Sequence, residues 1–176
     1  MTIEERYEWA CKDPDIGALI PVLRKYGEQC EHITEFGVRW GCSASAWLSA
    51  KPKKLVCYDI GRYPSVDEIA GLANGAGIEF QFRQENSAHA FIEETDLLFV
   101  DTVHNADQVK LELVGNHVGV EKFILFHDTE TYGQVGEGGA KGIWEAILLI
   151  VDTGDWRILE VRPESNGLTV LQRISK

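Results

Sequence analysis

The sequence has neither a long apolar run nor a secretory signal. No stretch approaches the roughly 18–20 apolar residues of a membrane-spanning helix. A signal would begin with a basic region followed by an apolar one, whereas this chain begins with Glu4, Glu5 and Glu8. We therefore expect a cytoplasmic protein with no membrane partner.

The sequence also has no cysteine motif. Its four cysteines show no Cys-x-x-Cys spacing, which argues against a zinc knuckle or a redox motif. We expect reduced thiols, mostly in or near the core, at Cys11, Cys30, Cys42 and Cys57.

Basic residues are few. Lysine and arginine total 17 against 28 aspartates and glutamates, so the formal net charge is −11. An acidic surface repels polyanions, which disfavours nucleic acid as a partner and suits a small, neutral or polar ligand. The acidity has a simpler alternative explanation, which is solubility alone.

Length and composition describe an ordinary globular protein. The chain has 176 residues, of which 44% are hydrophobic and 26% charged. This length corresponds to about one domain, and we find no internal repeat or low-complexity linker. We expect a single domain over residues 1–176, with an N-terminal helical segment (1–30) and a core (31–176).

Short β-branched or aromatic runs alternate with longer amphipathic ones, which is typical of a parallel sheet covered by helices. Two final runs lie too close together to hold a crossover helix, so they must be antiparallel. The pattern predicts an α/β, Rossmann-like three-layer sandwich with a seven-stranded, mostly parallel sheet and a C-terminal antiparallel hairpin. The expected strands are 32–36, 55–59, 78–82, 97–101, 123–127, 156–161 and 168–172, and the expected helices are 43–50, 66–74, 105–116 and 141–151, with a short turn or helix at 87–93. The N-terminal segment predicts one or two helices broken around residues 13–15, with Pro14 starting the second.

The first strand is followed by a glycine-containing turn. Gly37 and Gly41 allow a tight turn and close approach to a ligand, and Ser43 is placed to cap the next helix. Arg39 stands where a dinucleotide-binding motif needs its second glycine, which argues against a pyrophosphate. Asp59 follows Gly41 by 18 residues, close to the roughly 20 expected for a carboxylate that binds ribose hydroxyls. Together they suggest an adenosine ligand, although both features also occur as purely structural turns and caps.

Polar residues follow the third strand. Glu85, Asn86 and Ser87 would lie near an adenine edge, or would cap the short helix after them.

Carboxylates and imidazoles follow the fourth and fifth strands. Asp101 and Asp128 would repel each other unless a divalent cation or a proton lies between them, and oxygen ligands favour Mg²⁺. His104 is the candidate general base, or else only a helix-start residue, while His127 is interpreted as structural. A glycine-rich stretch, residues 133–142, is interpreted as a mobile loop over the substrate or as a surface turn.

Four motifs in chain order resemble the class I S-adenosylmethionine-dependent methyltransferases. Residues 35–43 have the form Glu-x-Gly-x-x-x-Gly-x-Ser and are similar to the first motif of the macrocin O-methyltransferase and cephalosporin hydroxylase-like group. The other three are 96–104, 126–129 and 166–171, which resemble the fourth-strand motif, the fifth-strand motif and the end of small stand-alone members. The resemblance covers roughly residues 30 to 173.

The resemblance implies roles for particular residues. Glu35 would meet the amino group of the methionine moiety and Asp59 the ribose, while Asp101 and Asp128 match positions that bind Mg²⁺ in metal-dependent relatives. One departure is Val103, which stands where many relatives have a second aspartate. The implied cofactor-binding set is Glu35, Gly37, Val38, Gly41, Ser43, Asp59, Glu85, Asn86, Ser87 and Asp101.

The resulting hypothesis is an enzyme, an S-adenosylmethionine-dependent methyltransferase that O-methylates a small or sugar-type acceptor with help from a divalent metal. His104 and Asp128 are its expected catalytic residues, because a hydroxyl acceptor must lose a proton during attack. The alternatives are an NAD-binding Rossmann protein and a non-catalytic nucleotide-binding module. A homo-oligomer is compatible with the sequence.

Overall fold

A computed structural model describes residues 1–174 and divides the chain into two compact units, residues 1–87 and 88–176. The predicted single domain over 1–176 stays a prediction, and its last two residues lie outside the described part.

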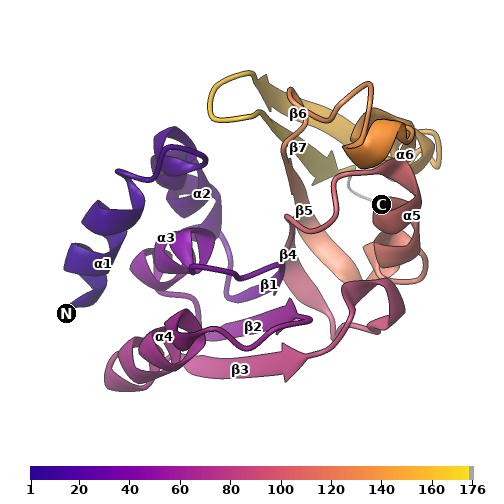
Figure 1. The fold of residues 1–176 in the computed structure, drawn as a ribbon. Helices are drawn as coiled ribbons and strands as arrows, with labels where there is room; N and C mark the ends of the chain where they lie inside the picture. Colours follow the sequence, from indigo (N-terminus) through magenta and orange to yellow (C-terminus); the bar gives the residue numbers. More distant parts are fainter. Residues whose placement is uncertain (175–176) are drawn as a thin grey trace. The chain divides into compact units, whose positions relative to one another are not determined.

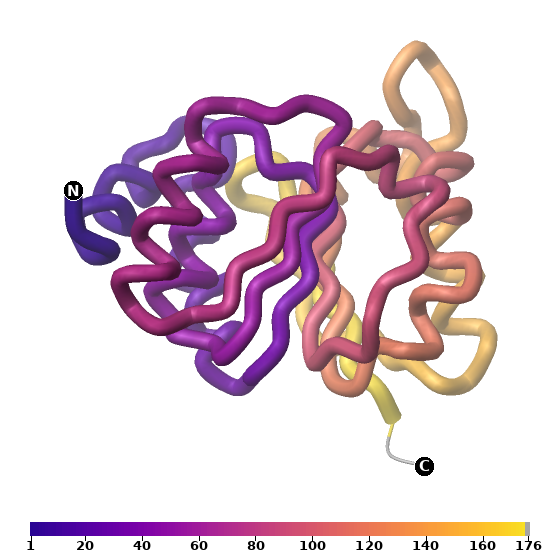
Figure 2. The backbone as a smooth tube through the Cα atoms, turned by 90° about the horizontal axis from the view of Figure 1, so that it is seen from below, coloured from indigo at the N-terminus to yellow at the C-terminus, as the bar shows by residue number. Residues whose placement is uncertain are grey.

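The first unit holds three parallel strands in the order β3-β2-β1. Figure 2 shows their backbones side by side. Two further helices, α1 and α2, pack against α3 (Figure 1). The elements are α1 (Ile3–Ala10), the 3₁₀ turn η1 (Gly17–Leu19), α2 (Ile20–Gly27), β1 (His32–Phe36), α3 (Cys42–Ala50), β2 (Lys54–Asp59), α4 (Pro64–Gly75) and β3 (Glu79–Gln84).

The second unit holds four strands in the order β4-β5-β7-β6. β4 and β5 are parallel, whereas β7 is antiparallel to both β5 and β6. The elements are η2 (Ser87–His89, beginning on the last residue of the first unit), β4 (Thr95–Val100), α5 (Ala106–Leu113), η3 (His117–Gly119), β5 (Val120–His127), η4 (Glu137–Gly139), α6 (Ile143–Val151), β6 (Trp156–Arg162) and β7 (Leu168–Arg173).

All seven predicted strands are present, and so is the C-terminal antiparallel hairpin. The prediction of a helix starting at Pro14 is wrong. The Asp13 carboxylate accepts hydrogen bonds from the amides of Asp15 and Ile16 and forms a turn there, and the second helix begins with Pro21 in its first turn. The helix predicted over 105–116 ends at Leu113, two residues before Gly115 turns left-handed with φ 80°.

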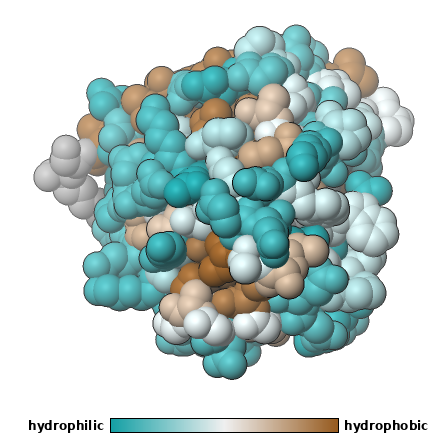
Figure 3. Space-filling model, turned by 90° about the vertical axis from the view of Figure 1, so that its left-hand side faces the viewer, coloured by the Kyte–Doolittle hydropathy of each residue, from teal (hydrophilic) through white to brown (hydrophobic). Residues whose placement is uncertain are grey.

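Helix α3 and most of the cysteines are buried. α3 is buried on almost every side, and Trp47 at its centre is fully buried. Cys30, Cys42 and Cys57 are buried and Cys11 is half-buried, and all four are free thiols. Within residues 1–174, none of the helices has the length and apolar character needed to cross a membrane. The face drawn in Figure 3 is mostly hydrophilic, with hydrophobic residues gathered in a limited area.

Gly71 provides a test of the helical assignment of α4. A Cβ at this position would meet no atom within 4 Å, and its backbone is not left-handed. Gly71→Ala should therefore raise the free energy of unfolding by about 0.5–1 kcal/mol, because alanine restricts the unfolded chain. Gly77→Ala is the matched control in equally open space. Gly77 has φ 72°, so that variant should lose stability in the same urea titration. Equal effects of the two changes would contradict the backbone assignment.

Candidate functional site

The glycine turn, residues 37–41, connects β1 to α3 in the first unit. Three of its residues are left-handed, with φ values of 87° at Gly37, 44° at Arg39 and 74° at Gly41. Glycine adopts this conformation freely, whereas at Arg39 it is strained and must be held by its surroundings. The carbonyl of Arg39 accepts a 2.5 Å hydrogen bond from the Ser65 hydroxyl.

Asp59, at the end of β2, holds the same turn from the other side. Its Oδ2 accepts hydrogen bonds from the amides of Val38 (2.8 Å) and Arg39 (3.1 Å), and its Oδ1 accepts one from Gly61 (2.9 Å). A carboxylate offers about four acceptor positions, so Asp59 retains room for a ligand hydroxyl. In this structure its carboxylate fixes the conformation of the turn.

Glu35, the fourth residue of β1, is fully buried. One of its carboxylate oxygens accepts a hydrogen bond from the Ser43 hydroxyl, and the other accepts one from the Cys57 thiol at 3.1 Å. Burial raises the pKa of Cys57 well above its usual value, and the charge of Glu35 adds to this effect. The prediction that Ser43 caps α3 is wrong, because Gly41 occupies the cap position and Ser43 lies inside the helix.

The predicted adenine-side residues follow β3. Glu85 and Asn86 are exposed, and Ser87 is buried at the start of η2. The amide of Glu85 donates to the Asp59 carbonyl at 3.0 Å. This contact ties the loop after β3 to the end of β2, where the ribose ligand was predicted.

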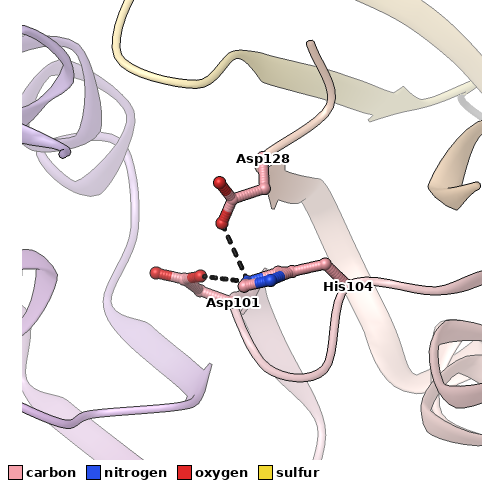
Figure 4. Close-up of side chains that lie close together, drawn as sticks. All are labelled: Asp101, His104 and Asp128. Carbon is pink, nitrogen blue, oxygen red and sulfur yellow. Dashed lines mark ion pairs between the residues drawn. The ribbon is translucent and has the colours of Figure 1, made fainter. Parts of the chain in front are cut away.

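In the second unit, the residues after β4 and β5 meet. Asp101 directly follows β4 and Asp128 directly follows β5, so the parallel pairing of these strands brings the two carboxylates together. Figure 4 shows both turned toward the ring of His104. The His104 Nε2 lies 2.9 Å from Asp128 Oδ2 and 3.6 Å from Asp101 Oδ1. Asp128 is also left-handed (φ 60°), a strain that often marks functional positions.

His127 joins the same cluster, at the strand end where the sequence placed it. Its Nδ1 lies 3.0 Å from Asp128 Oδ2 and 3.4 Å from Asp101 Oδ1. These are ion-pair distances, although neither contact is aligned as a hydrogen bond. Its Nε2 does bond the backbone as predicted, at 2.9 Å from the Ser165 carbonyl.

The partners of both rings define their protonation. Nδ1 of His104 faces Glu137 Oε1 at 2.7 Å, so both of its nitrogens face acceptors. The same holds for His127, between a carbonyl and two carboxylates, and each ring therefore carries two protons. Burial alone would lower the pKa of each ring, but Asp101 and Asp128 outweigh it and raise both pKa values to about 10.

The carboxylates respond in the opposite direction. Burial would raise the pKa of Asp101, but the charges of the neighbouring His127 and His104 rings lower it. The pKa of Asp128 is also lowered, because its contacts with the His104 and His127 rings outweigh its burial. The two aspartates are thus neutralised by imidazolium protons, one of the two solutions expected for paired carboxylates.

The loop after β5 surrounds His104. Tyr132 stacks on the His104 ring, with centroids 4.7 Å apart and planes 10° apart. The Glu137 amide also donates to the His104 carbonyl at 2.9 Å. A Cβ at Gly136 would lie 2.6 Å from that carbonyl, and Cβ atoms at Gly133 and Gly142 would collide with backbone. These glycines permit close packing of the loop around His104.

The cluster predicts a dependence of stability on pH. Because folding raises the pKa of His104 and His127 from 6.5 to about 10, their contribution is complete below pH 6.5 and is lost as the pH rises toward 10. The lowered pKa of Asp101 and Asp128 acts at the other end, where stability falls as acid protonates them. Urea unfolding in EDTA should show the alkaline loss in wild type and a smaller one in His104→Gln. Equal alkaline slopes would contradict the ion pairing.

The cluster also allows the metal prediction to be tested for fit. One ligand atom from each of Asp101, His104 and Asp128 lies within 4.8 Å of the others. Val103 is apolar and exposed, and supplies no ligand. A mixed nitrogen and oxygen set suits Zn²⁺, Fe²⁺ or Ni²⁺ better than Mg²⁺, and any cation must displace the Nε2 proton of His104. Metal ligation by Asp101 and Asp128 stays a prediction.

Comparison with known proteins gives a match in structure alone. No protein-family model matches the sequence, and no curated protein matches it either. The O-methyltransferase TomG from Streptomyces achromogenes, solved with S-adenosylmethionine, matches with a TM-score of 0.69 and 15% identity over 98% of this chain and 89% of that one. The S-adenosylhomocysteine-bound methyltransferase PaMTH1 from Podospora anserina has a TM-score of 0.61 and 17% identity over 98% and 88%.

A third match is an N1-methyltransferase by name. The 1,6-didemethyltoxoflavin-N1-methyltransferase from Burkholderia thailandensis, solved with bound 1,6-didemethyltoxoflavin and S-adenosylhomocysteine, has a TM-score of 0.67 and 11% identity over 98% of this chain and 83% of that one. At these identities the likeness concerns the fold. The predicted Rossmann-like α/β class is confirmed, and the chain has the fold of S-adenosylmethionine-dependent methyltransferases.

Proposed function

We propose that this protein is an S-adenosylmethionine-dependent methyltransferase. The observation that carries the proposal is the glycine turn, whose strained backbone is held in place by Asp59 in a fold shared with methyltransferases solved with this cofactor. Gly37 and Gly41 let a ligand approach the backbone of the turn closely, because neither has a side chain. Arg39 inside it disfavours a pyrophosphate and therefore NAD.

The residues of the turn suit the cofactor's polar groups. Asp59 keeps an acceptor position for a ribose hydroxyl, and its three backbone hydrogen bonds fix its direction. Glu35 is oriented by Ser43 and Cys57 and is the assigned partner of the amino group. The bound cofactor supplies an electrophilic methyl group. The remaining members of the proposed set are Gly37, Val38, Gly41, Glu85, Asn86, Ser87 and Asp101.

We assign acceptor chemistry to the cluster after β4 and β5. Asp128 accepts a hydrogen bond from the acceptor hydroxyl and orients it, which is the main requirement of an in-line displacement. His104 holds the Asp128 carboxylate, and its ring accepts the proton of the hydroxyl in the form that has lost the Nε2 proton. Because the pKa of His104 is raised to about 10, methyl transfer should increase as the pH rises toward that value. Asp101 and Asp128 would hold a divalent cation, which would lower the pKa of a bound hydroxyl.

Label transfer tests the activity. The protein is incubated with methyl-labelled S-adenosylmethionine and a panel of phenols, sugars, glycosides and amines. We expect labelled product from hydroxylated members and none from Asp128→Asn, which retains the shape of the side chain and tolerates a left-handed backbone. Transfer to amines alone would contradict O-methylation, and cofactor binding with no transfer to any class would favour a non-catalytic module.

A further inference from the structure

The N-terminal helix α1 contacts the glycine turn through one buried cation. Arg6 is only 5% exposed. Its Nη2 donates a 2.6 Å hydrogen bond to the Trp40 carbonyl in the turn, and its Nη1 lies 3.4 Å from Glu68 Oε2 on α4. A charged donor on a backbone carbonyl fixes the orientation of that peptide group.

Gly41 leaves the space that this contact needs. A Cβ at Gly41 would lie 3.2 Å from the Arg6 Nη2, closer than side chains ordinarily pack. Glycine at position 41 therefore serves two purposes. It leaves space for the Arg6 guanidinium, and it allows the left-handed backbone of the turn.

Anchoring of α1 alone does not account for an arginine here. The Arg6 Nε is buried without a hydrogen-bond partner among residues 1–174, and an unsatisfied buried donor is destabilising. An apolar side chain usually anchors a helix at least as well as a buried ion pair. The stacking of the guanidinium on Trp9, 4.2 Å from the ring centroid, holds it in place without satisfying Nε.

We propose that Arg6 is a positioning residue of the cofactor site. Three side chains hold successive groups of the glycine turn, since Asp59 binds the amides of Val38 and Arg39, Ser65 binds the Arg39 carbonyl, and Arg6 binds the Trp40 carbonyl. Arg6 thereby sets the direction of the peptide groups that face the ligand, and couples α1 to cofactor binding. This inference rests on the proposed function.

The test compares Arg6→Met and Arg6→Lys with a matched control, Thr2→Ala. Thr2 forms a capping box with Glu5, so the control loosens α1 while leaving the Arg6 contact intact. Calorimetry with S-adenosylhomocysteine should show that Arg6→Met binds at least about tenfold more weakly than wild type. This is the loss of affinity that corresponds to one lost hydrogen bond from a charged group. Arg6→Lys should recover part of the affinity, and Thr2→Ala should lower the melting temperature at unchanged affinity.

Amide hydrogen exchange separates failure of this inference from failure of the proposed function. Exchange of the turn amides should accelerate in Arg6→Met beyond its change in Thr2→Ala, with or without ligand. If wild type binds no cofactor, the proposed function fails, and exchange still decides whether Arg6 positions the turn. The inference would be overturned if the turn amides of Arg6→Met exchanged at the wild-type rate. It would also be overturned if Thr2→Ala lost as much cofactor affinity as Arg6→Met.

Discussion

Replacing His104 with alanine should lower kcat by about 10²–10⁴-fold, the range for loss of a general acid or base. The ring contacts Asp128 at 2.9 Å and Glu137 at 2.7 Å, so its removal frees the carboxylate that orients the acceptor. Cofactor affinity should stay unchanged, because the glycine turn and Asp59 are untouched. Single-turnover label transfer with the best acceptor measures the chemical step.

His89→Gln is the matched control for this change. His89 is an exposed histidine in η2, and its replacement should leave kcat and affinity at wild-type values. Full turnover in His104→Ala would show that the cluster takes no part in catalysis, whereas loss of cofactor binding would show that the variant acts through the fold.

Asp59→Ala should weaken S-adenosylhomocysteine binding by at least about tenfold and lower the free energy of unfolding by about 2 kcal/mol. The carboxylate accepts three backbone hydrogen bonds. Asp59 is half-buried, so water replaces part of what is lost, and the net loss corresponds to about one hydrogen bond to a charged group. Its loss releases the strained Arg39 conformation and removes the predicted ribose ligand together. Calorimetry and urea unfolding measure the two effects.

Asp67→Ala supplies the matched control for Asp59. Asp67 lies in the same unit, is mostly exposed, and pairs with Arg62, an arrangement that contributes little to stability. If both Asp59→Ala and Asp67→Ala bound S-adenosylhomocysteine with wild-type affinity, Asp59 would not belong to the cofactor site. If both variants lost the same affinity, the effect would be a general one of charge.

The fold was largely predictable, because the hydrophobic periodicity that distinguishes a strand from a helix lies within the short stretch of sequence that forms it. β1 and α3 fall within one residue of their predicted bounds. The error at Pro14 arose because two prolines compete to start the second helix, and the Asp13 carboxylate favours a turn at the first. Ser43 misled for a similar reason, since its hydroxyl prefers the buried Glu35 carboxylate to the helix end.

The two carboxylates of the cluster were also predictable, because residues that follow neighbouring parallel strands share one edge. The contact of His104 with Glu137 was not predictable. Glu137 lies 33 residues away, and only the path of a glycine-rich loop brings it close. Arg6 reaches Trp40 across 34 residues, and no local pattern distinguishes it from a surface arginine on an amphipathic helix.

A calorimetric titration of the wild-type protein with S-adenosylhomocysteine shows whether the chain binds the methyl-donor cofactor. We expect saturable binding to a single site, weakened in Asp59→Ala and retained in His104→Ala. Absence of binding at millimolar ligand by a protein that melts cooperatively would contradict it.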